Sequence, residues 1–105
     1  MKDIGLTIDE FNEVIGYIRN NPKIKKVIVY GSRAKGNYRQ FSDVDMTLIG
    51  DNLVVSDLAS LEDSLYFSFL PYKFDLSIFE NLKNFNLIDH INRVGVVIYD
   101  KVQQG

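Results

Sequence analysis

Three aspartates in two separate segments have the spacing of a metal site. Asp43 and Asp45 lie two residues apart in an alternating stretch that predicts a strand, so their side chains point to one face. Asp75 stands on the polar face of a later predicted strand. If the two strands are neighbours, the three carboxylates converge. Because close carboxylates repel one another, we expect them to bind a hard divalent cation such as Mg²⁺.

A second group of residues has the character of a phosphate-binding corner. Gly31 and Ser32 follow a buried predicted strand and open a short polar helix. Glycine allows a close backbone approach, and the free N–H groups of a helix start favour anions. Positive charge follows at Arg33, Lys35 and Arg39, and any of these could contact a triphosphate or an acceptor. We count Arg33 with Gly31 and Ser32 as candidate nucleotide-binding residues.

A P-loop is a competing interpretation of the same glycines. Gly31 and Gly36 match the first half of the pattern G-x-x-x-x-G-K-[ST]. Asn37 and Tyr38 stand where that motif needs the Lys and the Ser or Thr that contact phosphate and Mg²⁺. We therefore exclude the P-loop.

The elements that position these residues alternate between helix and strand. Helical patterns cover residues 8–20, a short turn after residue 31, 57–70 and the region around 87–94, while strand patterns cover 24–30, 43–49, 72–79 and 96–99. This order predicts an α/β (α+β) domain with a small mixed sheet flanked by helices. The strand order does not follow from the patterns.

Capping residues and apolar stripes define the helices further. Thr7 and Glu10 form a capping-box signature, Ser56 is the expected cap of the second long helix, and Gly95 is the expected C′ residue of the last one. Two inward stripes are expected: Ile8, Phe11, Val14, Ile15 and Ile18, then Leu58, Leu61, Leu65 and Phe69.

Composition limits the class of protein. A chain of 105 residues, 46% hydrophobic and 25% charged, predicts a single globular domain over residues 1–105. The net charge of −2 argues against stable nucleic-acid binding, and the absence of cysteine excludes disulfides and thiolate chemistry. No apolar run reaches the roughly 20 residues that span a bilayer, and no signal peptide is evident, so we expect a cytoplasmic protein.

Together, the two groups of residues resemble a known signature. Gly31-Ser32, ten intervening residues and then Asp43-x-Asp45 are similar to the G-S-x10-D-x-D motif of the DNA polymerase β-like nucleotidyltransferase superfamily. Asp75 matches the third carboxylate of that superfamily. The residues around the motif are most similar to those of the minimal nucleotidyltransferases, or MNT group. The resemblance implies a nucleotidyltransferase fold formed by this compact domain alone.

The resemblance also implies roles for the residues. Gly31 and Ser32 would hold the β- and γ-phosphates of a nucleoside triphosphate, with ATP as the expected donor. Asp43, Asp45 and Asp75 would ligate two Mg²⁺ ions, and Asp75 would help to deprotonate the acceptor hydroxyl. The acceptor would then attack the α-phosphorus, and pyrophosphate would leave.

The partner is implied by resemblance alone. MNT proteins are commonly found beside a helical HEPN toxin, and in such toxin–antitoxin pairs the nucleotidyltransferase is the antitoxin that transfers AMP to a Tyr of the toxin. Two alternatives remain open: transfer to a small molecule or an RNA end, and neutralisation of a partner by contact only.

The single histidine is expected to be structural or exposed. His90 lies in the last predicted helix beside Asp89, and we assign it no chemistry. The nucleotide base and the oligomeric state are not predicted.

Overall fold

A four-stranded mixed sheet forms the centre of the computed structural model, which describes residues 3–104. The strand order is β3-β2-β1-β4. β1 is antiparallel to both β2 and β4, and β2 is parallel to β3. The bounds are β1 Ile24–Tyr30, β2 Val44–Gly50, β3 Phe74–Ile78 and β4 Val96–Asp100.

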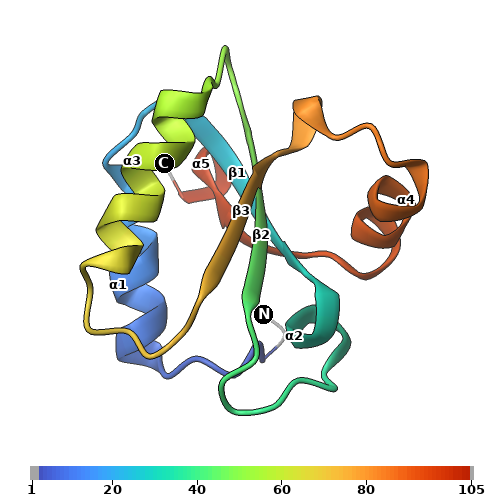
Figure 1. The fold of residues 1–105 in the computed structure, drawn as a ribbon. Helices are drawn as coiled ribbons and strands as arrows, with labels where there is room; N and C mark the ends of the chain where they lie inside the picture. The colour runs from blue at the N-terminus through green and yellow to red at the C-terminus, as the bar shows by residue number, and fades with distance from the viewer. Residues whose placement is uncertain (1–2, 105) are drawn as a thin grey trace.

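Helices cover both faces of the sheet unequally. In Figure 1, α1 and α3 pack side by side on one face, while α4 lies alone on the other and α2 follows directly from β1. The bounds are α1 Ile8–Arg19, α2 Gly31–Lys35, α3 Val55–Tyr66, the 3₁₀ turn η1 Phe79–Asn81, α4 Phe85–Val94 and α5 Lys101–Gln104. The predicted α/β class is confirmed. Among residues 3–104, no helix has the length and apolar character that crossing a bilayer would require.

The start of α1 follows its sequence signature. The Glu10 amide donates to Thr7 Oγ1 at 3.1 Å, and the Thr7 amide donates to Glu10 Oε1 at 2.9 Å, so the predicted capping box is confirmed. Val14 and Ile18 are buried as expected. Ile8 is 80% exposed, so its predicted place in the stripe is wrong.

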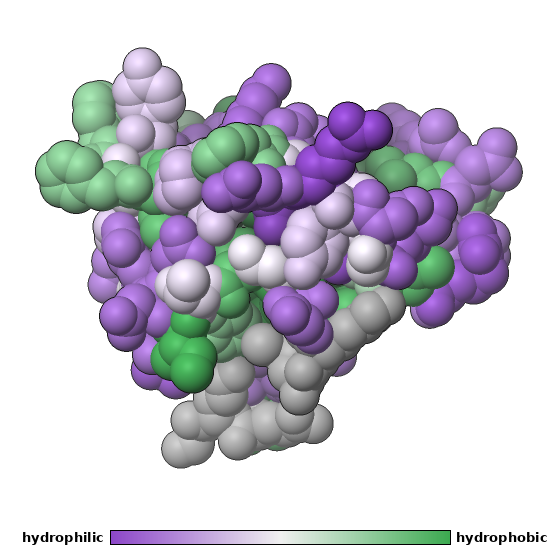
Figure 2. Space-filling model, turned by 90° about the horizontal axis from the view of Figure 1, so that it is seen from below, coloured by the Kyte–Doolittle hydropathy of each residue, from purple (hydrophilic) through white to green (hydrophobic). Residues whose placement is uncertain are grey.

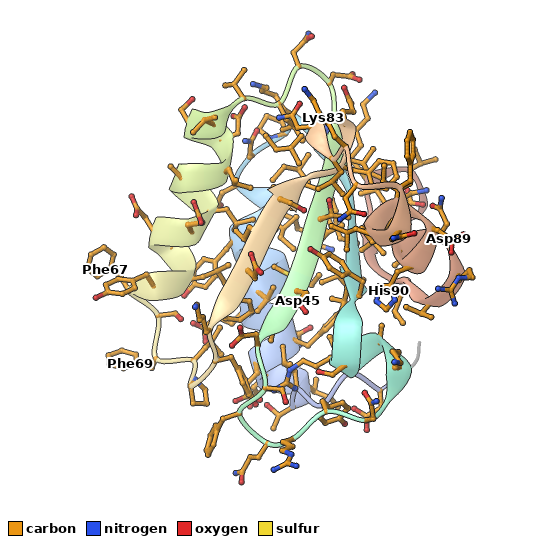
Figure 3. All side chains as sticks on the ribbon, turned by 45° about the vertical axis from the view of Figure 1, so that its right-hand side comes forward. Asp45, Phe67, Phe69, Lys83, Asp89 and His90 are labelled. Atoms are coloured by element: carbon orange, nitrogen blue, oxygen red, sulfur yellow. The ribbon has the colours of Figure 1, made fainter. Side chains whose placement is uncertain are left out.

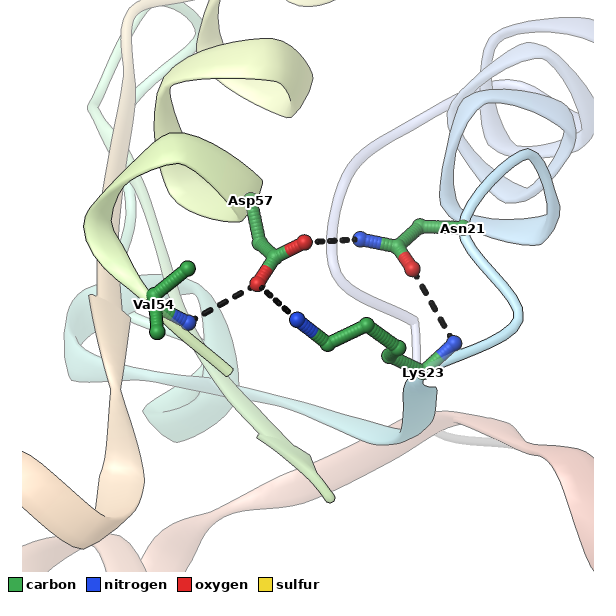
Figure 4. A network of polar contacts seen from close by, with 4 residues as sticks. All are labelled: Asn21, Lys23, Val54 and Asp57. Carbon is green, nitrogen blue, oxygen red and sulfur yellow. Dashed lines mark hydrogen bonds and ion pairs between the residues drawn. The ribbon is translucent and has the colours of Figure 1, made fainter. Parts of the chain in front are cut away.

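The start of α3 differs from the prediction. Its N-cap is Val54 rather than Ser56, and the Val54 amide donates to Asp57 Oδ2 at 2.8 Å. Asp57 also accepts from Asn21 Nδ2 at 2.9 Å and from Lys23 Nζ at 2.6 Å (Figure 4). This network caps α3 and joins it to the segment between α1 and β1. It also lowers the pKa of Asp57 to about 2, chiefly through Lys23.

The end of α3 is also earlier than predicted. The helix ends at Tyr66, because the Ser68 hydroxyl donates to the Leu65 carbonyl at 2.6 Å and accepts from the Leu70 amide at 3.2 Å, which turns the chain away. Leu65 is buried as expected, but Phe69 is fully exposed, so its predicted core position is wrong. Apolar side chains project from this side of the molecule in Figure 2.

The helix α4 packs through a thin apolar contact on the second face. Ile91 is 1% exposed, and the chain leaves α4 at Gly95 with a φ of −57°, not in the left-handed conformation expected of a C′ glycine. A Cβ on Gly95 would approach Ile28 Cγ2 to 2.6 Å. The same Cβ would clash first with the backbone carbonyl of Ile91, so glycine is needed where the chain passes between the end of α4 and β1.

Candidate active site

The parallel pairing of β2 and β3 sets two of the predicted carboxylates side by side. Asp45 is directly opposite Asp75 in the register, and Tyr30 of β1 is opposite Asp45 on its other side. Alternation places Asp45 on the face opposite its buried neighbours Val44 and Met46, which is the face toward α4. Figure 3 shows Asp45 on the sheet and His90 reaching toward it from α4.

Asp43 lies one residue before β2 and is exposed. It is near enough to raise the pKa of Asp45, as Asp75 also does. Within residues 3–104, no three acidic, histidine or cysteine side chains are placed closely enough to hold a metal ion, so the three-carboxylate clamp stays a prediction.

The pKa of Asp45 indicates which kind of ligand this arrangement favours. Burial raises the pKa of Asp45, and the charges of Asp75 and Asp43 raise it further, while His90 lowers it. The Asp45 carboxylate is therefore held where its ionised form is costly, and a bound cation would remove that cost. Carboxylate oxygens are the ligands that Mg²⁺ prefers, so the donor set of these aspartates fits such an ion.

Gly31 brings the backbone against this carboxylate. Its φ is +72°, in the left-handed region, and a Cβ at this position would clash with Asp45 Oδ2. The corner predicted from Gly31-Ser32 thus lies next to one of the predicted metal ligands. Ser32 is half-buried in the first turn of α2, and Lys35 is exposed at the end of the same helix.

His90 contacts the candidate site, a position that the sequence did not predict. Its Nε2 accepts a hydrogen bond from the Gly31 amide at 3.1 Å, and its ring lies edge-on to Tyr30 with centroids 6.2 Å apart. The role is structural, as expected, but it is exerted on the candidate phosphate corner. The contact joins residues 59 positions apart in the chain, and no local pattern signals it.

Arg33 is placed differently from the prediction. It is 0% exposed, and its guanidinium donates to backbone carbonyls of Ile4, Gln40 and Ser42. A buried cation whose donors are engaged by carbonyls cannot also bind a triphosphate. The predicted nucleotide contact of Arg33 is therefore corrected to a structural role. Arg39 is exposed.

One hollow of the surface lies away from these residues. It measures about 310 Å³, sits between α3 and the start of β3, and is lined by residues such as Glu62, Tyr66 and Lys73. Neither Asp45 nor Asp75 lines it. The candidate site is instead the shallow, acidic surface between Gly31, Asp45 and Asp75.

Comparisons with known proteins agree with this geometry. A curated relative, the "putative protein adenylyltransferase" of Methanocaldococcus jannaschii, is 48% identical over 29 residues, which is 28% of this chain and 29% of the relative. A solved toxin–antitoxin structure with AMP-PNP has a TM-score of 0.71 at 24% identity, covering 90% of this chain and 76% of that one. A Shewanella oneidensis complex, a tri-AMPylated HEPN toxin with its MNT antitoxin, has a TM-score of 0.64 at 22% identity, covering 90% and 72%.

The two structural likenesses show a shared fold. The family follows from a separate match: the model of the family described as "Polymerase beta, Nucleotidyltransferase" covers residues 12–104, nearly the whole chain. This agrees with the motif of Gly31, Ser32, Asp43 and Asp45 and with the strand register that brings Asp75 beside Asp45. The chain belongs to the polymerase beta nucleotidyltransferase family.

Proposed function

We propose that this protein is a Mg²⁺-dependent nucleotidyltransferase that moves AMP from ATP to a hydroxyl group of a partner protein. One observation carries the proposal: the register sets Asp45 opposite Asp75, and the Gly31 backbone closes against Asp45. A pure binding protein gains nothing from neighbouring carboxylates whose charges raise the pKa of Asp45 at a sheet surface. A metal-dependent phosphoryl-transfer site needs them.

Each residue of the candidate site has a separate role in this proposal. Gly31 and Ser32 hold the β- and γ-phosphates, and Asp43, Asp45 and Asp75 are the ligands for two Mg²⁺ ions. The bound ions would neutralise charge on the phosphate oxygens. Asp75 is exposed at the edge strand, where an incoming hydroxyl can reach it, and it takes the hydroxyl proton.

The bonds change in one displacement. The acceptor oxygen forms a bond to the α-phosphorus, and the bond from that phosphorus to the bridging oxygen breaks. Pyrophosphate leaves with the electron pair. Catalysis comes from positioning and from charge neutralisation, as is general for phosphoryl transfer.

We further propose that the acceptor is a Tyr of a helical HEPN-type toxin and that this protein is its antitoxin, in the cytoplasm. Two findings support this assignment: the fold is shared with the MNT antitoxin of the tri-AMPylated toxin complex, and a curated relative is named as a protein adenylyltransferase.

The test is transfer of label to the partner. The protein is incubated with labelled ATP, Mg²⁺ and a HEPN-type helical protein, and the intact masses of both proteins are measured. We expect AMP units on the partner, lost in Asp45→Asn and retained in Asp89→Asn, an exposed control on α4 that pairs with Arg93. Label on RNA or a small hydroxyl compound alone would contradict the protein acceptor. Neutralisation that survives Asp43→Asn with Asp45→Asn would show a contact-only antitoxin.

A further inference from the structure

The most completely buried charge of the described residues belongs to Arg33, which no phosphate-binding role explains. Its Nη1 donates to the Ile4 carbonyl at 2.9 Å and its Nη2 to the Gln40 carbonyl at 3.1 Å. Its Nε and Nη2 both donate to the Ser42 carbonyl, at 3.1 and 2.9 Å. The guanidinium also faces the rings of Tyr38 and Tyr72, with its carbon 5.0 and 4.8 Å from their centroids.

Ser42 is held by all of its polar groups. Besides the two bonds from Arg33 to its carbonyl, its amide donates to the Arg39 carbonyl at 3.1 Å, and its hydroxyl accepts from the Arg39 amide at 2.8 Å. On the other side of Asp43, the Val44 amide donates to the Lys73 carbonyl at 2.8 Å. Asp43 is thus an exposed residue between two fixed neighbours, so its backbone position is set by theirs.

We propose that Arg33 is a positioning residue for Asp43, acting through the Ser42 carbonyl. The inference rests on the proposed function, in which Asp43 is a metal ligand. Arg33 also lies two residues after Gly31. Its side chain therefore links the phosphate corner to the segment that carries Asp43. The planar fork of arginine can donate two parallel bonds to one carbonyl and still reach two others, which the single ammonium of lysine cannot reproduce.

If the inference is correct, a substitution that keeps the positive charge of residue 33 still weakens metal binding. In Arg33→Lys, we expect about 10-fold weaker binding of Mn²⁺, read from the electron paramagnetic resonance signal of free Mn²⁺, since loss of an outer-shell partner has this size. Hydrogen exchange of the Ser42 amide should accelerate, while the Met46 amide in β2 stays protected. Arg93→Lys is the matched control, because Arg93 is exposed and pairs only with Asp89 among the contacts described.

A double-mutant cycle separates positioning from a general loss of structure. If Arg33 acts through Asp43, Arg33→Lys has no further effect on Mn²⁺ binding once Asp43→Asn is present. Where Arg33→Lys fails to fold, Ser42→Ala removes the hydroxyl bond to the Arg39 amide without touching the buried charge, and we expect a smaller loss of Mn²⁺ affinity than the lysine variant would show.

Three outcomes would overturn the positioning role of Arg33. Wild-type affinity in the folded lysine variant, or in Ser42→Ala where that variant is used, overturns the positioning role. Equal losses with and without Asp43→Asn overturn it too. A wild-type protein that binds no Mn²⁺ overturns the proposed function itself, and the inference with it.

Discussion

The two faces of the sheet differ at the start of β2, where one is apolar and the other carries charged side chains. Toward α1 and α3, Val29, Met46 and Leu48 are each 0% exposed and belong to one apolar core. Toward α4, the same strands present Asp45 and Asp75, whose charges oppose each other. A shift of one residue in the register would exchange the two faces, so the apolar core also determines where the acidic surface lies.

The comparison shows that stability and the proposed chemistry come from different faces. Burial of apolar surface favours folding, whereas like charges held together oppose it. Substitutions on the first face should therefore change the free energy of unfolding, and substitutions on the second should change metal and nucleotide binding, with small effects on stability of the opposite sign. The predictions below test this division.

The largest effect on stability is expected on the apolar face. Met46→Ala should lower the free energy of unfolding by about 2–5 kcal/mol, because it leaves a cavity where the side chain is fully buried. Urea denaturation measures this loss. Val97→Ala on β4 is the control, since Val97 is 45% exposed and its loss should be much smaller. Equal losses at both positions would mean that the apolar face is not the main source of stability.

The next effect tests the contact between the two halves of the site. Gly31→Ala combines a left-handed φ of +72° with a clash against Asp45 Oδ2. Gly36→Ala is matched to it, because Gly36 has a φ of +88° and open space at its Cβ position. Both should lose roughly 1–2 kcal/mol through backbone strain. Only Gly31→Ala should also lose ATP binding in titration calorimetry, and similar ATP binding by both variants would contradict the close approach.

A smaller change in stability, an increase and not a loss, is expected for Asp45→Asn. The folded-state pKa of Asp45 lies above its ordinary value of 3.8, so ionisation opposes folding as the pH rises above that value. At pH 7 the variant should melt roughly 1–4 °C above the wild type, a modest shift because the carboxylate is partly solvated. Calorimetry below pH 3.8 should show no difference. A variant that is less stable at pH 7 would show that the acidic surface is not a cost to folding.

The acid on the other face should behave in the reverse way. Asp57 has a folded-state pKa of about 2, below its ordinary 3.8, so its ionised form stabilises the fold. The stabilisation is present above pH 3.8 and is lost as the pH falls toward 2. Asp57→Asn should flatten the dependence of Tm on pH in that range, and the exposed Asp89→Asn should not. Parallel curves for wild type and Asp57→Asn would contradict the network drawn in Figure 4.

Much of this fold is written in local patterns. The alternation of Asp45 and Met46 on β2 and the capping box at Thr7 predicted their elements within a few residues. Errors lie at both ends of α3. Asp57 caps the helix through the Val54 amide, three residues before it, and also bonds to Asn21 and Lys23, contacts that no rule for neighbouring residues contains.

The site was predictable in its residue types but not in all of their roles. The spacing of Gly31, Ser32, Asp43 and Asp45 carries information because it is fixed along the chain. The burial of Arg33 and the hydrogen bond of His90 to Gly31 depend on segments 29 and 59 residues away, which only the folded chain brings together. A cationic residue next to a phosphate-binding motif is therefore readily predicted to bind phosphate, although its burial in the folded chain can exclude that role.

The turn after β2 has a practical consequence. Asp51 and Asn52 lie at the end of the strand opposite to Asp45, and Asn52 adopts a φ of 55° in a short exposed bend (Figure 1). Ladder hydrogen bonds, not the length of this bend, fix which residues of β2 and β3 face each other. An affinity tag spliced between Asp51 and Asn52 should thus leave the acidic surface intact, giving a handle for capturing complexes that does not touch either terminus.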